Sequence, residues 1–212
     1  MGGRLDATNV VVPLVSVITN IALEHTEFLG KTVEKIAFEK AGIIKHEVPV
    51  VTAASGSALK VIRKIAAEKN AHLYLPDKII IKNNKLSINS YKNIELGLKA
   101  SYQYKNAAVA LKVIDVLRNN YKIILTKNHI LAGLKKTYWP ARFEFRETNI
   151  VIDAGHNPAG FEVLKKELAK IKKNYRKIIL IFSALKDKDV KRMISIIKLV
   201  VHEFIITKVH NK

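Results

Sequence analysis

Apolar and polar positions alternate in blocks that predict strands and helices in turn along the first third of the chain. Residues 14–19 form an apolar, β-branched run that is typical of a buried strand. Thr32 can cap a helix that runs to Ala41, where Gly42 ends it. Residues 48–53 predict a second strand, Ser57 opens a helix, and residues 72–75 predict a third strand. Strand, helix, strand, helix, strand is the order of a parallel α/β sheet.

The pattern changes after this sheet. Residues 78–89 predict a hairpin that turns at Asn83 and Asn84, and a helix follows over about 103–117. Thr126 caps a shorter helix, and residues 138–145 (YWPARFEF) contain Pro140 and no helical period, so they indicate a linker. A strand at 149–153, a helix after Pro158, a strand at 177–185, a helix from about Asp189 and a strand at 203–207 predict the start of a second α/β sheet.

We therefore expect two partial α/β domains, residues 1–137 and 147–212, joined by a linker at 138–146. Residues 1–10 supply Gly, Arg, Asp and Asn ahead of the first strand, as though the chain enters in the middle of a loop. The last predicted strand stops at Thr207, before a short basic tail. Such small sheets bury little apolar surface, so we expect both domains to be incomplete.

The composition is that of an ordinary globular protein, with 49% hydrophobic and 26% charged residues among 212. Pro13, Ser16, Thr19 and Asn20 interrupt the longest apolar run, which excludes a convincing membrane span, and the N-terminus lacks a signal-peptide pattern. The absence of cysteine removes disulfides and thiolate metal sites. These features predict a cytoplasmic protein with no membrane partner.

The formal net charge of +19 leaves three interpretations open. A nucleic-acid binder would use such a charge to neutralise phosphates. Anionic small substrates would also be attracted by a basic surface. The lysines are scattered through every segment, however, and this pattern favours solvated faces over a specific nucleic-acid footprint.

One stretch looks like a phosphate-binding loop but lacks its first glycine. Gly30, Lys31 and Thr32 match the end of G-x-x-x-x-G-K-[ST], and the opening glycine would have to stand at position 25, which is His25. The stretch is therefore not that loop. His25 follows a predicted parallel strand at the edge where open α/β sheets bind ligands, so it is either a surface histidine or part of a site.

Lys40 occupies an unexpected position in the first predicted helix. The apolar stripe of this helix is Val33, Ile36, Ala37 and Ala41, and Lys40 falls on the same stripe. A buried ammonium group is costly unless it is paired or chemically altered. The alternative is that the side chain extends out to solvent from the last helical turn.

Five segments together resemble one protein family. They are GGRLDATN (2–9), VSVITNIALEHTEFLGKTVEKIAFEKAGIIK (15–45), ARFE (141–144), IDAGHNPAG (152–160) and ALKDKDV (184–190). They occur in the order typical of the bifunctional folylpolyglutamate synthase/dihydrofolate synthase family, which belongs to the Mur-type ligases. By this resemblance, residues 1–137 correspond to part of the central ATPase domain and residues 147–212 to part of a Rossmann-like C-terminal domain.

The resemblance implies roles for individual residues. His25 would ligate Mg²⁺, and Lys40 would be the family's carbamylated lysine, whose carbamate is an anionic oxygen ligand suited to a hard cation. Asn106, Arg142 and Asp153 would contact ATP, and His156 would orient the phosphate or the incoming amine. Asn106 also falls with Gln103 on the predicted inward stripe of its helix, so a buried hydrogen-bonded amide is its alternative role. A salt bridge is the alternative for Arg142, and a helix cap is the alternative for Asp153.

The implied reaction is ATP-dependent addition of L-glutamate to dihydropteroate or a folate through an acyl phosphate. Three departures from the family stand out. The glycine-rich phosphate loop is absent, and the metal-binding glutamate that precedes the GGRLDATN motif is also absent, because Met1 stands inside that motif. In the third departure, Ala154 and Gly155 occur in the reverse of the usual order. Glu24 also replaces the usual aspartate before the histidine. We therefore expect the fragment to be inactive without an N-terminal partner. A Mur-type ligase of peptidoglycan synthesis and a non-catalytic basic remnant that binds nucleic acid are the alternatives.

Overall fold

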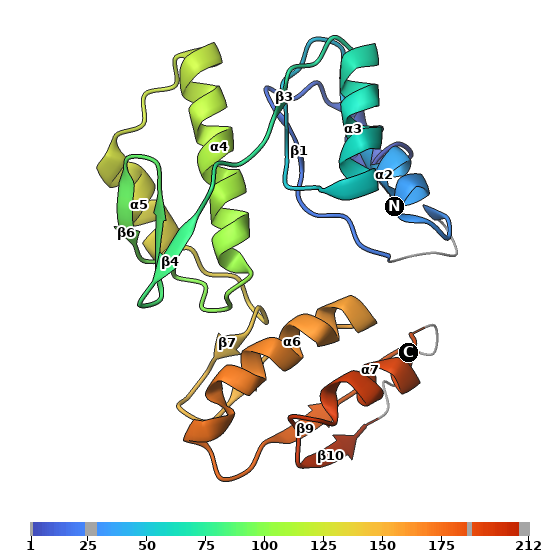
Figure 1. Cartoon of the computed structure of the whole chain (residues 1–212), viewed down its shortest axis with the longest axis vertical. Coiled ribbons are helices and arrows are strands. Elements are labelled where there is room, and N and C mark those ends of the chain that lie inside the picture. The colour runs from blue at the N-terminus through green and yellow to red at the C-terminus, as the bar shows by residue number, and fades with distance from the viewer. Residues whose placement is uncertain (1, 24–28, 186–187, 208–212) are drawn as a thin grey trace. The chain divides into compact units, whose positions relative to one another are not determined.

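The computed structural model describes residues 2–23, 29–185 and 188–207. The chain divides into two compact units (Figure 1). The first comprises Met1–Gly97 and Tyr102–Tyr138, and the second comprises Leu98–Ser101 and Trp139–Lys212. The segment Leu98–Ser101 therefore belongs to the second unit, although it lies in sequence between the two ranges of the first.

The first unit contains the parallel sheet that the sequence predicts. It is formed by β1 (Ser16–Ile18), β2 (Val50–Thr52) and β3 (Leu73–Tyr74), in the order β1-β2-β3. Both pairings are parallel, with Val17 opposite Val51 and Val51 opposite Tyr74. Each strand is shorter than the apolar run that predicted it.

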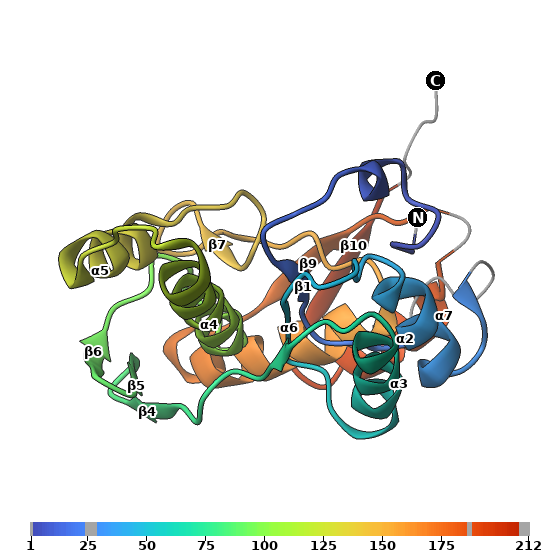
Figure 2. The ribbon, with the colours of Figure 1, turned by 90° about the horizontal axis from the view of Figure 1, so that it is seen from above.

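Helices pack on both sides of this sheet. On one face, α2 (Val33–Ala41) and α3 (Gly56–Glu68) lie side by side (Figures 1 and 2) and bury Ala37, Ile62 and Val50 in one apolar cluster. The hydroxyl of Thr32 accepts a hydrogen bond from the Lys35 amide, which confirms the predicted cap of α2. On the other face, Val51 packs against α4 (Gln103–Tyr121).

A three-stranded antiparallel sheet completes the first unit, together with the 3₁₀ helix η1 (Ala7–Val10) and the helix α5 (Lys127–Lys136). Its strands are β4 (Ile80–Lys82), β5 (Lys85–Ile88) and β6 (Tyr91–Ile94). The turn at Asn83 and Asn84 is confirmed, and both residues have positive φ angles of 49° and 56°. The sequence did not predict β6.

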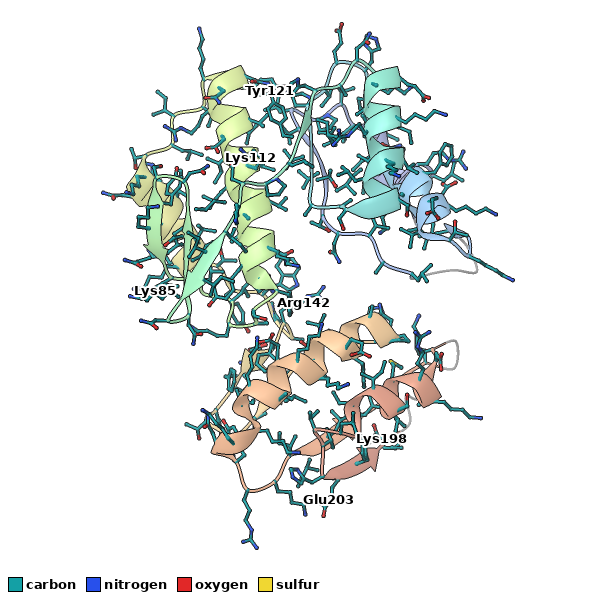
Figure 3. The ribbon with its side chains drawn as sticks, viewed as in Figure 1. Lys85, Lys112, Tyr121, Arg142, Lys198 and Glu203 are labelled. Atoms are coloured by element: carbon teal, nitrogen blue, oxygen red, sulfur yellow. The ribbon has the colours of Figure 1, made fainter. Side chains whose placement is uncertain are left out.

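Lys112 of α4 and Asp77 form an ion pair at 2.5 Å beside this sheet (Figure 3).

The predicted inward stripe of α4 is wrong in part. Gln103 is buried as predicted, but Asn106 is exposed. The helix buries Val109 and Val116 against β2 while Ala107, Ala108 and Leu111 belong to the cluster of the antiparallel sheet. Because α4 packs against two different sheets, its buried residues do not form one stripe, and Asn106 belongs to neither buried cluster.

The second unit contains two small sheets. The strands β7 (Glu144–Phe145) and β8 (Val151–Ile152) pair antiparallel, and β9 (Ile179–Phe182) and β10 (Glu203–Ile206) pair parallel. The helices α6 (Pro158–Ile171) and α7 (Val190–Ile197), with the 3₁₀ helix η2 (Lys172–Asn174) between them, lie against β9 and β10 (Figure 1). Among the described residues, no helix is long and apolar enough to span a bilayer.

Phe161 of α6 is the largest fully buried side chain of the second unit, with 1% of its surface exposed. Its ring meets that of Phe182 edge to face, with centroids 5.2 Å apart. We predict that Phe161→Ala lowers the free energy of unfolding by about 3–5 kcal/mol, because a large cavity is left in a small core. Urea unfolding measures this loss. Phe145→Ala is the matched control, since Phe145 is 40% exposed; an equal loss in both variants would contradict the assigned core.

A buried carboxylate ties Leu98–Ser101 to α6. Glu167 is 5% exposed and accepts hydrogen bonds from the Ser101 hydroxyl and from Lys170 Nζ, the latter at 2.8 Å. Burial raises the pKa of Glu167, but the hydrogen bonds from Lys170 and Ser101 outweigh burial and hold this pKa below its ordinary value of 4.5.

The lowered pKa of Glu167 predicts an acid-dependent loss of stability. A depressed folded-state pKa contributes stability above the unfolded-state value of 4.5, and this contribution disappears as the pH falls through the lower folded-state value. We therefore expect Glu167→Gln to flatten the decline in unfolding free energy below about pH 4.5. Denaturation curves recorded at a series of pH values test this expectation. Parallel declines in the parent chain and the variant would contradict it.

Candidate functional site

A cavity of about 300 Å³ opens in the first unit at the carboxyl end of β1. Thr19 and Asn20, which directly follow the strand, form one side of it. Lys40 from α2 forms another. The remaining lining residues are Gly2, Gly3, Asp6, Val17, Ile18 and Ile43. The position agrees with the general rule that open α/β sheets bind ligands beyond the carboxyl ends of their strands.

Lys40 lies in the last turn of α2, between side chains that belong to the core. Ile36, Ala37 and Ala41 are completely buried, whereas Lys40 is half-buried and borders the cavity. The predicted stripe is therefore confirmed, with Lys40 at the edge of the core. His25, which was predicted to lie beside it, falls outside the described residues.

The N-terminal segment is held against the end of α2 by paired hydrogen bonds. Both nitrogens of the Arg4 guanidinium fork donate to the Glu39 carboxylate, at 3.0 and 3.1 Å, and the Arg4 amide donates to the Glu39 carbonyl at 2.9 Å. Asn9 donates from Nδ2 to the carbonyl of Gly42, and Lys45 donates to the carbonyl of Asn9 at 2.6 Å. These bonds fix one wall of the cavity.

Gly42 permits this close approach. It ends α2 with φ of −61°, so the left-handed cap that normally explains such a glycine is absent. A Cβ atom at Gly42 would instead lie 2.4 Å from Cβ and 2.6 Å from Cα of Arg4. The glycine is required because the N-terminal segment passes directly over the helix end.

Among the described residues that line the cavity, Asp6 is the one that carries a carboxylate. Its Oδ1 accepts hydrogen bonds from the hydroxyl and the amide of Thr8, at 2.6 and 3.0 Å. These bonds are the largest causes that lower the pKa of Asp6, to about 2, so the group is ionised at neutral pH. Sequence reasoning did not assign a role to Asp6, although it stands within the quoted segment GGRLDATN.

The loop after β8 carries Asp153 and His156 in the second unit. The Asp153 carboxylate accepts hydrogen bonds from the amides of Phe143 and Gly155, at 2.9 and 2.8 Å. It therefore ties this loop to the segment that carries the exposed Arg142 (Figure 3). Asp153 does not cap α6, because that cap is Asn157.

His156 is exposed, and its Nδ1 lies 3.1 Å from the carbonyl oxygen of Ala154. A carbonyl can only accept, so this nitrogen is the donor when the bond forms, and Nε2 is then the basic nitrogen that faces solvent.

Asn106 is fixed by a buried neighbour in the first unit. Its Nδ2 donates to Oε1 of Gln103 at 2.9 Å, and Gln103 is only 6% exposed. The exposed amide of Asn106 is therefore oriented before any ligand arrives. The alternative role as a buried core amide is wrong for Asn106, which is exposed.

Two further observations bear on where the site lies and on what its described residues can bind. Within residues 2–23, 29–185 and 188–207, no group of three or more His, Asp or Glu side chains is arranged to hold a metal ion. A larger cavity of about 530 Å³ lies between α2 and α3, lined by residues such as Phe38, Val61 and Ile65. Of the predicted site residues that the structure describes, Lys40 alone borders the cavity at the end of β1, and none borders the larger cavity, so we assign the site to the former.

Comparison with known proteins finds similar ligases along both units of the chain. Residues 141–212 match the family model described as Mur ligase, glutamate ligase domain. The dihydrofolate synthase/folylpolyglutamate synthase of Bacillus subtilis is 36% identical over 95% of this chain and 50% of its own length. The folylpolyglutamate synthase of Lacticaseibacillus casei is 35% identical over 91% of this chain and 48% of its own length.

Solved structures of similarly named synthases also resemble this chain in fold. Escherichia coli FolC in complex with ADP, without folate substrate, superposes with a TM-score of 0.88 at 30% identity, over 100% of this chain and 52% of that chain. Mycobacterium tuberculosis folylpolyglutamate synthase complexed with ADP gives 0.84 at 28% identity, over 98% of this chain and 50% of that one. The chain thus spans about half the length of the relatives that it matches.

The contact between Gly42 and Arg4 predicts a local effect of a single methyl group. We expect Gly42→Ala to push residues 3–9 away from α2 and to lower the unfolding free energy by about 1–3 kcal/mol, since overpacking forces the backbone to move. Hydrogen exchange of residues 3–9 should become faster. Gly133→Ala is the matched control, because a Cβ there meets nothing within 4 Å, and it should be neutral or stabilising. Unchanged exchange in the Gly42 variant would disprove the contact.

Proposed function

We propose that this chain, a relative of the dihydrofolate synthase/folylpolyglutamate synthases over about half of their length, is part of an ATP-dependent ligase that joins L-glutamate to dihydropteroate or tetrahydrofolate. The main support is that the likeness to these relatives runs through both units. Residues 1–137 are assigned to the central ATPase portion, 138–146 to the linker and 147–212 to the Rossmann-like C-terminal portion. The family model that matches residues 141–212 supports the last assignment.

ATP is the proposed phosphate donor. Support comes from the E. coli and M. tuberculosis structures, both of which are complexes with ADP. In this chain we assign the nucleotide contacts to Asn106, Arg142 and Asp153. Asn106 and Arg142 are exposed and so accessible to a ligand, and Asn106 and Asp153 are already oriented by hydrogen bonds within their own units.

Mg²⁺ is the proposed metal, held by Lys40 in its carbamylated form and by His25. The donor chemistry of the cavity fits a hard cation, because Asp6 supplies an ionised carboxylate and Thr19 and Asn20 border the same space. When bound, such an ion neutralises charge on the phosphates of ATP. A half-buried lysine at the edge of the core is also suited to hold a carbamate close to a metal site.

In the proposed reaction, an oxygen of the substrate carboxylate attacks the γ-phosphorus of ATP, the bond to the β-phosphate oxygen breaks, and ADP leaves. The α-amine of glutamate then attacks the acyl carbon, phosphate departs, and the nitrogen loses a proton. The chain's own residues bind and orient these groups. We assign to His156, an exposed residue in the loop after β8, the role of accepting that proton or orienting the phosphate. We propose that the protein acts in the cytoplasm, since a chain without cysteine fits a reducing compartment.

The test uses this chain mixed with the N-terminal half of the B. subtilis relative, the part expected to carry the phosphate loop. We expect ATP-dependent incorporation of labelled glutamate into dihydropteroate by the mixture and none by the chain alone. Lys40→Ala should reduce the rate by roughly 100-fold or more, because a metal ligand is lost. Lys60→Ala, on the exposed side of α3, is the control and should retain full activity.

Isotope-labelled bicarbonate should also give a carbamate resonance in the NMR spectrum of the parent chain that disappears in the Lys40 variant. Activity that survives Lys40→Ala would contradict the role of Lys40. An inactive mixture of halves that have been shown to associate would leave the ligase assignment unsupported.

A further inference from the structure

The segment Leu98–Ser101 leads the chain directly into α4. Ala100 is 1% exposed, and the Ser101 hydroxyl donates a hydrogen bond to the buried carboxylate of Glu167 in α6. The next residue, Tyr102, is the N-cap residue of α4, a helix of 19 residues. The chain is therefore fixed within the second unit immediately before this helix begins.

The first turn of α4 has no side-chain cap of its own, in contrast to α2, α5, α6 and α7. The N-cap side chain of each of these four helices accepts a hydrogen bond from the amide three residues later. No such bond is made at Tyr102, and the first turn of α4 contains no acidic residue. A first turn without a cap frays more easily, because its amides have no partner within the helix. The start of α4 therefore depends on the residues that precede it.

This first turn carries the residue that we assign to the nucleotide. Asn106 is oriented by its hydrogen bond to Gln103 at 2.9 Å, and Gln103 is the first residue of α4. Ser101 lies only two residues before Gln103. Fraying of a helix begins at its end, so a loss of order at Ser101 would reach Gln103 first and then the side chain of Asn106.

We infer that Ser101 and Glu167 are positioning residues for Asn106, because their hydrogen bond holds the start of α4 and with it the amide that contacts the nucleotide. The contact with the nucleotide rests on the proposed function, whereas the hold on α4 rests only on the bond between Ser101 and Glu167. Glu167 belongs to the second unit and Asn106 to the first. The order of the second unit is thus coupled, along the chain, to a nucleotide contact in the first.

Tyr104 is a competing anchor for the same turn. Its side chain is 8% exposed, and its hydroxyl donates to the Asn84 carbonyl at 2.9 Å. This bond lies within the first unit and is left intact when Ser101 is changed. A readout confined to the first turn of α4 separates the two anchors.

Hydrogen exchange of the chain alone tests the hold on α4. Ser101→Ala should speed exchange of the amides of residues 105 and 106 by about fivefold or more, and it should leave the last two turns of α4 unchanged. Ser101→Thr keeps the hydroxyl and should restore slow exchange. Ser195→Ala is the matched control, because this exposed serine of the second unit donates to a carbonyl of its own helix at 2.7 Å.

Steady-state kinetics test the link to the nucleotide, in the mixture with the N-terminal half of the B. subtilis relative. Ser101→Ala should raise the KM for ATP by about threefold or more and leave the KM for glutamate unchanged. In an Asn106→Ala background the same substitution should cause no further rise, because both changes remove one contact. A purely structural role for Ser101 would give the same factor in both backgrounds.

Unchanged exchange at residues 105 and 106 would mean that Tyr104 holds the turn without Ser101, and would overturn the inference. Faster exchange along the whole of α4, or an equal effect of Ser101→Ala in both backgrounds, would overturn it as well. A parent mixture without ligase activity would instead count against the proposed function, and the exchange measurement would still decide whether Ser101 fixes the start of α4.

Discussion

The fixed position of the N-terminal segment on the end of α2 is the constraint on which the candidate site depends. Arg4 and Glu39 form a two-pronged ion pair, and Asn9 and Lys45 continue the hydrogen bonding past Gly42. A planar guanidinium fork matches a carboxylate in both distance and angle, so this pair fixes orientation as well as proximity. This pair therefore helps to keep Asp6 and Lys40 on the lining of the same cavity.

The sequence predicted the elements of this structure well where a local cause determines them. Thr32 caps α2, and Asn83 with Asn84 forms a hairpin turn, because each of these features depends on only a few neighbouring residues. It predicted less well where distant packing decides. Asn106 shares its helical period with buried residues, yet it is exposed because α4 packs against two different sheets. The strand β6 was missed for a different, local reason: Asn93 has a positive φ angle inside it, which β propensity disfavours.

The residues of the candidate site also differ in how far the sequence could reveal them. Lys40 was recognised because a charged residue on an apolar stripe is a conflict visible in the sequence itself. Asp6 was not, since a short acidic residue near the N-terminus has many possible roles until Thr8 and the cavity are seen around it. The family likeness named Arg142, Asp153 and His156, but only the structure shows that Asp153 joins their two segments through the Phe143 amide.

The short segment Leu98–Ser101 has a consequence for how the chain must be assembled. It belongs to the second unit, where the Ser101 hydroxyl satisfies the buried Glu167, although the residues on either side of it belong to the first. During synthesis this segment emerges long before α6, so it waits without its partner while the first unit becomes able to fold. An expression product that began at Trp139 would bury the Glu167 carboxylate without the serine that satisfies it. The boundary between the units is thus a poor place to cut the gene.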